Sequence, residues 1–412
     1  MTRNTITLFG NFGTQNLGNE YTLKAILENL RERLPGARFD CVCPDPQDAT
    51  KRYGIEAALM SYRYGKDFRS AGARSPRVIR WLRRIFLRVP REMLEWLQAF
   101  RRLRKTRLLV MTGTGMLGDF GIGPLDLHYE ILKWSILAKM SGSKLLFVSV
   151  GAGPIESPLS RWIVKRAVSL ADYRSYRDTF SKEYLAGIGF DTRGDSVYPD
   201  LAFSLTPDVP KAPREHLNGR VVGVGLMDYY GRSSDPEQGS AAYRRYLEKV
   251  TAFVAFLLQR GYTVKLLTGD LSYDTRVKRD LLAMLEERRP PASDGRLIDP
   301  PIGSVEELVA QLATADLVVA TRFHNILLSL MLRKPVVALS YHPKIASLMS
   351  GVGMSEYCQD IEASDPGGLI ERFSRLERNE AAIRSLIVRK TGEYERALDE
   401  QYTRIASLFG SA

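Results

Sequence analysis

Basic and imidazole side chains follow two strand-like runs in the second half of this sequence. The apolar run 317–320 leads into Arg322 and His324, and the run 335–340 leads into Lys344. Consecutive parallel strands are usually neighbours in a sheet, so we expect these three side chains to converge. Arginine binds carboxylates and phosphates through a rigid fork of donors, lysine supplies a point charge, and histidine transfers protons near neutral pH. Each alone would more often be structural or solvated, but together they predict an anion-binding active site.

Three glycine-rich loops follow strand-like runs in the first half. They span residues 10–20, 112–119 and 151–154, and such loops let backbone N–H groups approach a ligand closely. The first loop lacks the spacing of a dinucleotide site and the Lys-Ser/Thr of a phosphate loop. Each loop alone could be an ordinary strand-to-helix turn, whereas three at successive strand ends predict a pocket for a hydroxyl-rich small molecule.

The candidate ligand residues of these loops are Asn16, Gly18, Gly115 and Asp119. Asp119 could accept hydrogen bonds from a sugar diol or could cap the following turn. A further candidate is Arg177, which follows the strand-like run 172–176. An arginine at the carboxyl end of a parallel strand faces the ligand side of the sheet, although Arg177 could also be solvated.

Short apolar runs rich in β-branched residues alternate with helical patterns along the whole chain. This alternation predicts the α/β class with mainly parallel sheets, arranged as two doubly wound Rossmann-like domains that face a cleft. The expected strands are residues 5–9, 38–43, 108–112, 144–150, 172–176, 221–226, 263–268, 317–320 and 335–340.

The domain boundaries follow from a proline-rich stretch near the middle of the chain. Three prolines fall within the eight residues 206–213, which indicates a linker over residues 207–219. The expected domains are residues 1–206 and 220–380. Residues 381–412 form a charged C-terminal helix.

One segment carries the entire excess of positive charge. The chain has 412 residues and a net charge of +12, and residues 61–107 contain 15 Lys/Arg against 3 Asp/Glu. Between residues 77 and 105, a helical pattern sets apolar side chains on one face and arginines on the other. This pattern is typical of a helix that lies on an anionic membrane surface, or of a core helix with a solvated basic face. We do not expect nucleic acid as a partner, because no recognised motif accompanies the charge.

Three cysteines are too few for a disulfide framework, which favours a reducing compartment. No apolar run is long enough to span a bilayer, and the N-terminus lacks the apolar core of a signal peptide. We therefore expect a cytoplasmic protein, with the inner face of the membrane as a candidate location. With only four histidines in the chain, we do not expect a metal site at Cys41 and Cys43. We also expect the protein to need no cofactor.

At these residues the sequence resembles the polysaccharide pyruvyl transferase family over about residues 5–350. The shared elements are Asn16-Leu17-Gly18, Gly113-Thr114-Gly115, Arg177-Asp178-x-x-Ser181, Pro199-Asp200, Arg322-Phe323-His324 and Lys344. Two positions depart from the family pattern: Asn19 stands where Asp is frequent, and Phe323 replaces the usual Leu.

The resemblance implies a fold similar to that of the type B glycosyltransferases. It also implies transfer of pyruvate from phosphoenolpyruvate onto two hydroxyls of one sugar, giving a cyclic ketal in surface polysaccharide or exopolysaccharide biosynthesis. Phosphoenolpyruvate would be the donor substrate, held by Arg322 and Lys344 on the C-terminal side and by Arg177 of the N-terminal domain. The acceptor, a sugar or a lipid-linked oligosaccharide, would bind the N-terminal domain through Asn16, Gly18, Gly115 and Asp119.

The chemistry expected of these residues begins with His324. We hypothesise that His324 protonates the methylene carbon of phosphoenolpyruvate, that a sugar hydroxyl attacks the resulting oxocarbenium-like carbon, and that phosphate then leaves. Two rivals remain at this stage: a nucleotide-sugar-dependent glycosyltransferase and a non-catalytic sugar-binding or membrane scaffold protein. The sequence does not specify the acceptor sugar, its reacting hydroxyls or the oligomeric state.

Overall fold

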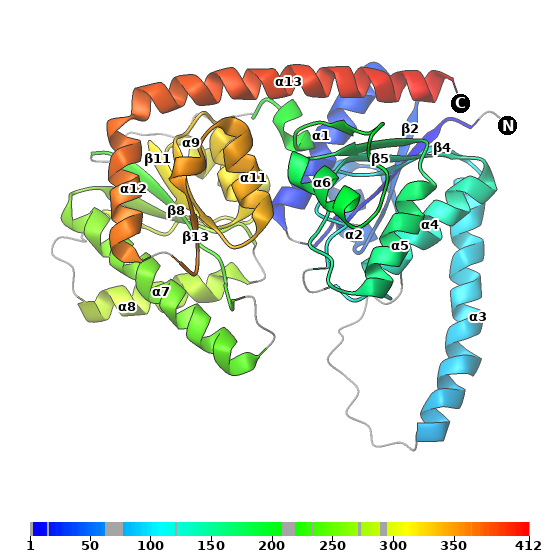
Figure 1. The fold of residues 1–412 in the computed structure, drawn as a ribbon, viewed down its shortest axis with the longest axis horizontal. Coiled ribbons are helices and arrows are strands. Elements are labelled where there is room, and N and C mark those ends of the chain that lie inside the picture. The colour runs from blue at the N-terminus through cyan, green and yellow to red at the C-terminus, as the bar shows by residue number, and fades with distance from the viewer. Residues whose placement is uncertain are drawn as a thin grey trace. The chain divides into compact units, whose positions relative to one another are not determined.

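The structure is a computed structural model of the 412-residue chain (Figure 1). It describes residues 3–14, 16–61, 77–119, 122–207, 219–231, 235–270, 273–288, 295–363 and 365–411, with the side chains of 77–89 left out. Most of the predicted linker, residues 208–218, and part of the basic segment, residues 62–76, lie outside the described residues.

Two compact units make up the fold. Unit 1 comprises residues 1–14, 22–202 and 397–412, and unit 2 comprises residues 15–21 and 203–396. The expected domains differ from these units at two places. The short segment 15–21 belongs to unit 2, and the long C-terminal helix is divided between the units at residue 396.

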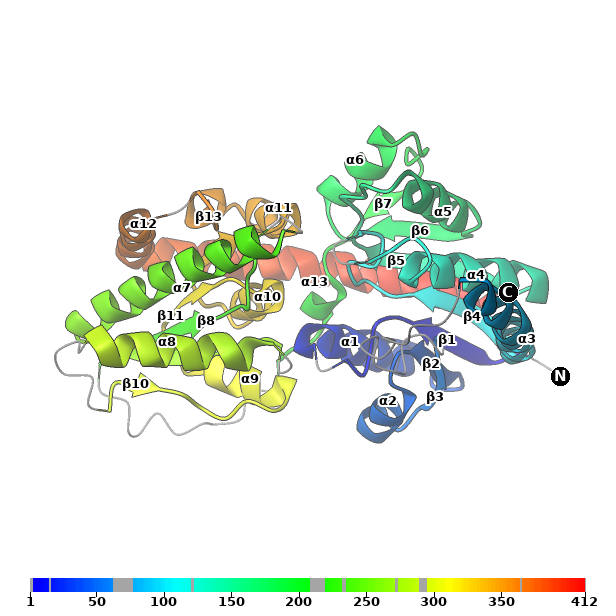
Figure 2. The same ribbon diagram turned by 90° about the horizontal axis from the view of Figure 1, so that it is seen from below.

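The sheet of unit 1 has seven parallel strands in the order β3-β2-β1-β4-β5-β6-β7. The strands are β1 (Thr5–Phe9), β2 (Arg38–Cys43), β3 (Glu56–Leu59), β4 (Thr106–Met111), β5 (Lys144–Val150), β6 (Tyr173–Tyr176) and β7 (Ser196–Val197). The helices are α1 (Leu17–Arg33), α2 (Pro46–Tyr53), α3 (Arg77–Leu103), α4 (Leu127–Ser141), α5 (Pro158–Ser169) and α6 (Thr179–Gly187). The strand order reverses between β1 and β4, so α1 and α2 cover one face of the sheet and α4 and α5 cover the other (Figure 2).

The sheet of unit 2 has six parallel strands in the order β10-β9-β8-β11-β12-β13. The strands are β8 (Val221–Gly225), β9 (Thr263–Leu267), β10 (Leu297–Ile298), β11 (Leu317–Ala320), β12 (Val336–Ser340) and β13 (Cys358–Asp360). The helices are α7 (Pro236–Gln259), α8 (Asp274–Arg288), α9 (Val305–Ala313), α10 (Phe323–Met331), α11 (Pro343–Val352), α12 (Pro366–Arg378) and α13 (Glu380–Gly410), with short 3-10 helices at Leu201–Ser204 and Ser355–Tyr357. The predicted pair of parallel α/β domains is confirmed.

The central strands were predicted within two residues, because each is a buried apolar run. Four strands were missed: β3, β7, β10 and β13. They lie at or next to the sheet edges, have two to four residues and are only partly buried, so they carry no strong apolar pattern. Within the described ranges, no helix is long and apolar enough to cross a membrane.

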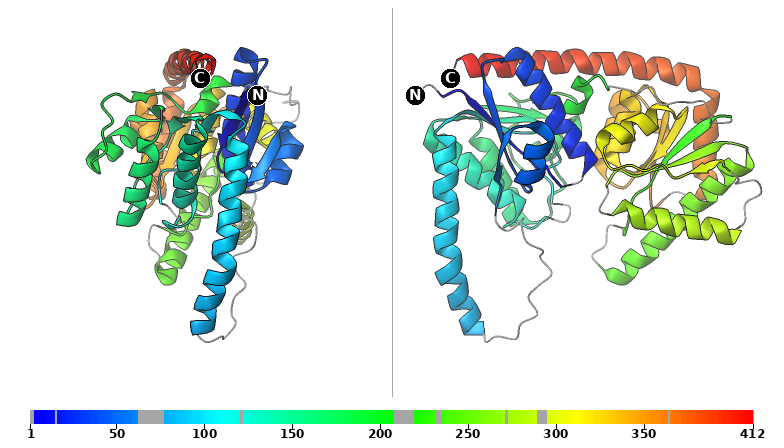
Figure 3. Two further views of the ribbon diagram at one scale, coloured as in Figure 1. Left: turned by 90° about the vertical axis from the view of Figure 1, so that its right-hand side faces the viewer. Right: turned by 180° about the vertical axis from the view of Figure 1, so that it is seen from behind.

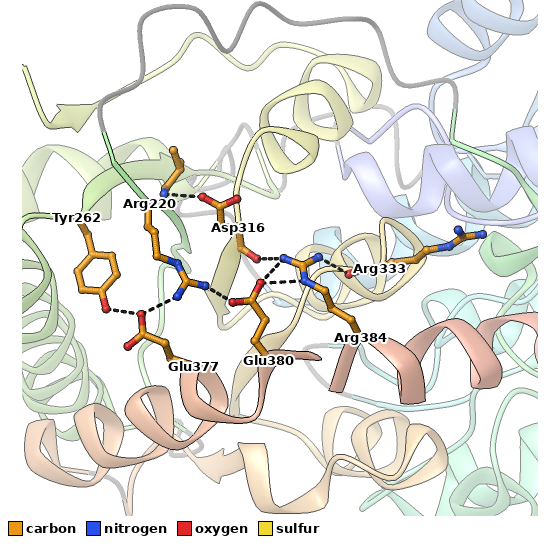
Figure 4. A network of polar contacts seen from close by, with 8 residues as sticks. Arg220, Tyr262, Asp316, Arg333, Glu377, Glu380 and Arg384 are labelled. Carbon is orange, nitrogen blue, oxygen red and sulfur yellow. Dashed lines mark hydrogen bonds and ion pairs between the residues drawn. The ribbon is translucent and has the colours of Figure 1, made fainter. Parts of the chain in front are cut away.

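A polar network fastens α12 and the start of α13 to the sheet of unit 2 (Figure 4). Arg220, just before β8, donates to Glu377 at 3.0 Å and pairs with Glu380. Arg384 donates to Glu380 at 2.7 Å and to the carbonyl of Asp316 at 2.8 Å. Burial and the neighbouring carboxylate of Glu377 raise the pKa of Tyr262 to about 12, which keeps this phenol a donor. The helix junction is therefore held by charge-assisted bonds to strand ends.

A buried ion-pair cluster fastens α3 to α4 in unit 1. The Lys133 side chain is 1% exposed, and its Nζ lies 2.7 Å from Glu130, 3.4 Å from Glu92 and 3.7 Å from Glu95. Tyr129 donates to Glu92 at 2.7 Å and accepts from the indole of Trp96 at 3.1 Å. One cation thus compensates three carboxylates, two of which come from α3.

Replacing Lys133 by methionine should lower the free energy of unfolding by about 3–5 kcal/mol, since Glu130 would then be buried without its cation. Urea denaturation would measure the change. The matched control is Lys139→Met, whose ammonium is 39% exposed and 2.7 Å from Asp172. The control substitution should lower the free energy of unfolding by about 1 kcal/mol or less. Equal losses of unfolding free energy in the two variants would contradict the role of Lys133 as the cation of a buried cluster.

Burial raises the pKa of Glu130 to about 7, although Lys133 acts against this shift. The folded-state pKa is above the unfolded value, so the folded protein binds this proton more tightly. The resulting stabilisation is full below the unfolded pKa and is lost as pH rises through about 7. Glu130→Gln should therefore flatten the fall of unfolding free energy between about pH 5 and 8, measured by urea denaturation at each pH. An unchanged slope would contradict this.

Candidate functional site

The first turn of α10 is the centre of the candidate site in unit 2. Strand β11 ends at Ala320, and Arg322 is the N-cap residue, in extended conformation and without a side-chain capping bond. Phe323 is buried, while His324 is partly exposed on the first turn. The N–H groups of a first turn have no partner within their helix, and the helix dipole favours negative charge there. The local geometry therefore suits an anionic ligand.

Arg322 is held by a buried carboxylate that the sequence analysis missed. Its Nε and Nη2 donate to Asp274 at 3.1 and 2.6 Å, and the Asp274 side chain is 0% exposed. Asp274 also accepts from the backbone N–H groups of residues 228, 269 and 270 at 2.9–3.2 Å. Burial works against the charge of Arg322, but Asp274 outweighs it and the pKa of Arg322 is raised.

This arrangement changes what Arg322 can offer a ligand. The edge formed by Nε and Nη2 is occupied by Asp274, so a substrate would meet the other edge, which carries Nη1. Asp270, at 3.9 Å, is the nearest carboxylate to Nη1 among the described ion pairs of Arg322. Asp274 therefore fixes the plane of the guanidinium and the direction of its remaining donors. From the sequence alone, Asp274 looks like an ordinary first-turn acid of α8.

Gly18 lies directly against His324. A Cβ atom built on Gly18 would come within 1.7 Å of Cγ of the imidazole ring. Asn16 accepts hydrogen bonds from the N–H groups of Gly18 and Asn19 at 3.2 and 3.4 Å, and it forms an isolated backbone bridge with Asp270. The prediction had placed Asn16 and Gly18 on the acceptor side of the N-terminal domain. The structure instead groups them with unit 2, because the start of α1 packs on the first turn of α10.

Gly18→Ala should lower the activity of this site by at least about a hundredfold, because the new methyl group must displace the imidazole of His324. A steady-state activity assay would measure this loss. The matched control is Gly36→Ala, since a Cβ on Gly36 meets no atom within 4 Å and Gly36 lies outside the site. Full activity in Gly18→Ala would show that the His324 ring is not held as described.

Lys344 reaches the same turn from the neighbouring strand. His342 caps α11, with its Nδ1 accepting from the N–H of Lys344 at 3.2 Å. The ammonium of Lys344 lies 5.5 Å from the ring centroid of Phe323 and 5.4 Å from that of Tyr341. The Phe323 ring is in turn 5.2 Å from the His324 ring. The structure thus places Arg322, His324 and Lys344 just after the neighbouring strands β11 and β12, with the Lys344 ammonium near the Phe323 ring.

Arg177 lies in unit 1, at the end of β6. It is buried, and its Nη1 and Nε are 3.4 and 3.6 Å from Asp200 and Asp178. Burial raises the pKa of Asp200, although the charge of Arg177 opposes this. A Cβ on Gly151 would approach Nη2 of Arg177 to 2.6 Å, so a side chain there would require the guanidinium to shift. The structure describes Arg177 beside the glycine loops of unit 1 and in a different unit from Arg322 and Lys344.

The glycine loops after β4 and β5 are joined to one another. Leu117 donates to the carbonyl of Gly151 at 3.1 Å, and Gly153 donates to the carbonyl of Leu117 at 3.0 Å. Asp119 accepts from the N–H groups of Glu156 and Ser157 at 2.6 and 3.2 Å. These bonds tie Asp119 to the loop that precedes α5 and not to the turn that follows Asp119. Gly115 is exposed at the rim of the loops.

In the part of the chain that the structure describes, no group of three or more His, Cys, Asp or Glu is placed to hold a metal ion. Cys41 and Cys43 are both buried in β2 with their sulfurs 3.8 Å apart, and Cys358 is also unbridged. Burial raises the pKa of Cys358 to about 11, so its thiol stays protonated near neutral pH.

A model of the polysaccharide pyruvyl transferase family matches residues 16–343, which include the Gly18 segment, the glycine loops, Arg177 and the Arg322–His324 turn. The chain belongs to this family. It is also similar to the amylovoran biosynthesis protein AmsJ of Erwinia amylovora, with 23% identity over 318 residues, 75% of this chain and 74% of AmsJ. Membership in this family identifies the chain as a transferase of polysaccharide biosynthesis.

Solved structures similar to this family member share its fold. HepE of Anabaena, in complex with UDP and glucose, aligns with a TM-score of 0.59 and 12% identity over 99% of this chain and 100% of HepE. A glycosyltransferase of Rickettsia africae aligns with a TM-score of 0.60 and 8% identity over 99% of each chain. UDP-GlcNAc 2-epimerase of Methanocaldococcus jannaschii aligns with a TM-score of 0.56 and 10% identity over 90% of this chain and 91% of the epimerase. The fold is therefore that of the type B glycosyltransferases and related epimerases, as predicted.

Proposed function

We propose that this protein transfers pyruvate from phosphoenolpyruvate to two hydroxyls of one sugar, forming a cyclic ketal. The observation that carries the proposal is the placement of Arg322 and His324 at the first turn of α10 and of Lys344 at the start of α11, with its ammonium 5.5 Å from the Phe323 ring centroid. Phosphoenolpyruvate has a phosphate and a carboxylate, which match two cations and a helix N-terminus. The imidazole of His324, on the first turn of α10, supplies a group that can donate a proton near neutral pH.

The proposed reaction starts with proton transfer from His324 to the methylene carbon of phosphoenolpyruvate, which becomes the methyl group. A sugar hydroxyl adds to the electron-poor C2 and loses its proton. The C2–O bond to phosphate then breaks, and inorganic phosphate leaves with the bonding electron pair. A second hydroxyl of the same sugar adds to C2 and closes the ketal. Of the two hydroxyl protons, one restores His324 and the other balances the released phosphate.

The cations have separate tasks in this scheme. Arg322 would hold one anionic group through its Nη1 edge, since Asp274 occupies the other edge. Lys344 would hold the second anionic group while Phe323 and Tyr341 flank its ammonium. Donors fixed before the reaction stabilise developing charge without having to reorganise. Arg177 is kept as a candidate ligand of an anionic substrate group in unit 1, and Gly115 as a candidate contact of the acceptor sugar.

The alternative is transfer of a sugar from a nucleotide sugar, an activity for which this fold also serves in other proteins. The observation in its favour is the similarity to structures whose titles include UDP or UDP-glucose. Their identity to this chain is 12%, which supports the fold and not the donor. A nucleotide sugar offers no carbon that needs protonation, so the imidazole would act there only as a base toward the acceptor hydroxyl.

Mass spectrometry of the acceptor tests the proposal. The purified protein is incubated with phosphoenolpyruvate and a panel of nucleotide sugars and lipid-linked oligosaccharides. The expected product is an acceptor that has gained one pyruvate as a ketal, with one phosphate released per ketal formed. Extension of an acceptor by a sugar from the nucleotide sugars, without consumption of phosphoenolpyruvate, would establish the alternative.

A further inference from the structure

Helix α3 has one face that packs against the rest of unit 1 and one face that is exposed. Figure 3 shows α3, in cyan, extending beyond the sheet of unit 1. Ala99 and Leu103 are buried, and Trp96 and Phe100 pack partly buried against the same core. Both acids of α3, Glu92 and Glu95, form ion pairs with Lys133 of α4. Both carboxylates of α3 therefore form ion pairs on its packed face.

The opposite face exposes large apolar side chains. Met93, Leu94 and Leu97 are 67%, 58% and 42% exposed, and their spacing puts them on one side of the helix. We call these three residues the α3 apolar stripe. Pro90, in the preceding turn, is also exposed. Single exposed apolar residues are common on protein surfaces. Three on one helix face instead indicate a surface that a membrane or another molecule covers.

Positive charge surrounds this stripe. The side chain of Arg91 is 50% exposed, and Arg101, Arg104 and Lys105 are exposed at the C-terminal end of α3 and just after it. The α3 sequence as a whole contains eight arginines against two glutamates, and both glutamates are turned to Lys133. Arg91, which is 3.8 Å from Glu95, and the exposed Arg101, Arg104 and Lys105 thus give the apolar stripe a basic border at its two ends.

We propose that the α3 apolar stripe and its basic border form a docking surface for an anionic lipid bilayer. The apolar side chains would enter the boundary between headgroups and acyl chains, and the arginines would contact lipid phosphates. A nucleic acid would use the arginines and leave the stripe exposed, whereas an apolar protein partner would not need the basic border. The surface lies on unit 1 and does not involve His324, so the proposal stands independently of the pyruvyl transfer reaction.

Co-sedimentation of the full chain with vesicles tests the proposal. The wild type is expected to sediment with phosphatidylglycerol-rich vesicles at low salt and not with pure phosphatidylcholine vesicles. The double variant Leu94→Glu/Leu97→Glu should bind at least about tenfold more weakly, since two apolar contacts become two repelled charges. The matched control is Met140→Glu on α4, because Met140 is 65% exposed and lies outside the stripe. It should bind like the wild type.

Three results would overturn the proposal. The first is wild-type protein that stays in the supernatant with anionic vesicles at low salt. The second is undiminished binding by the double variant, with a thermal midpoint equal to that of the wild type. The third is a wild-type dimer that the double variant converts to a monomer without any vesicle binding, which would identify the stripe as a contact between two copies of the chain.

Discussion

Replacing His324 by alanine should lower pyruvyl transfer by about two to four orders of magnitude, while phosphoenolpyruvate still binds. The loss follows from the task of His324, because no other titratable side chain that the structure places at the first turn of α10 can give up a proton near neutral pH to the methylene carbon. Arg322 and Lys344 remain in place, so the affinity for the anionic donor should change little. Steady-state rates and calorimetric titration with phosphoenolpyruvate would measure the two quantities separately.

Two controls sharpen this prediction. Added imidazole should restore part of the activity of His324→Ala, since the cavity left by the ring lies against Gly18. The thermal midpoint of the variant should stay near that of the wild type, because His324 is partly exposed. Wild-type turnover in His324→Ala would contradict the role of proton donor and leave the cations as the only support for the reaction.

Arg322→Lys should weaken phosphoenolpyruvate binding by about 10–150-fold, which corresponds to the 1.5–3 kcal/mol of one charge-assisted hydrogen bond. A lysine keeps the charge but loses the planar fork, so it can neither hold Asp274 through two donors nor present Nη1 in a fixed direction. The change should appear mainly in the KM for phosphoenolpyruvate.

Asp274→Asn tests the same geometry from the other partner. The neutral amide would hold the guanidinium less firmly, so the KM for phosphoenolpyruvate should rise while the KM for the acceptor stays unchanged. A purely structural role of Asp274 would change both values, or only the thermal midpoint. A wild-type KM for phosphoenolpyruvate in both Arg322→Lys and Asp274→Asn would show that this arginine does not meet the donor.

The sequence predicted the parts of the site that are local in the chain. Arg322, His324 and Lys344 follow apolar runs that can only be buried strands, and parallel neighbours bring their carboxyl ends together. Asp274 could not be found in this way, because it contacts Arg322 from 48 residues upstream. In the sequence it is one acidic residue at the start of a helix, which carries no signal of a contact to Arg322.

Gly18 shows the same limit more strongly. A glycine in a strand-to-helix loop suggests backbone approach to a ligand, and nothing in the local pattern indicates that a histidine ring from the other half of the chain fills that space. Tertiary contacts decide such roles. The edge strands were missed for a related reason: with few residues and partial burial, the sheet positions them more than their own sequence does.

The most direct test of the proposed donor is a thermal-shift comparison of phosphoenolpyruvate with a panel of nucleotide sugars, on the wild type and on Arg322→Ala. A ligand at a hundred times its Kd stabilises the folded state by about 2.7 kcal/mol, which moves the midpoint by several degrees in a chain of this size. We predict a shift with phosphoenolpyruvate that disappears in Arg322→Ala. A shift with nucleotide sugars alone would contradict the proposed donor and with it the ketal reaction.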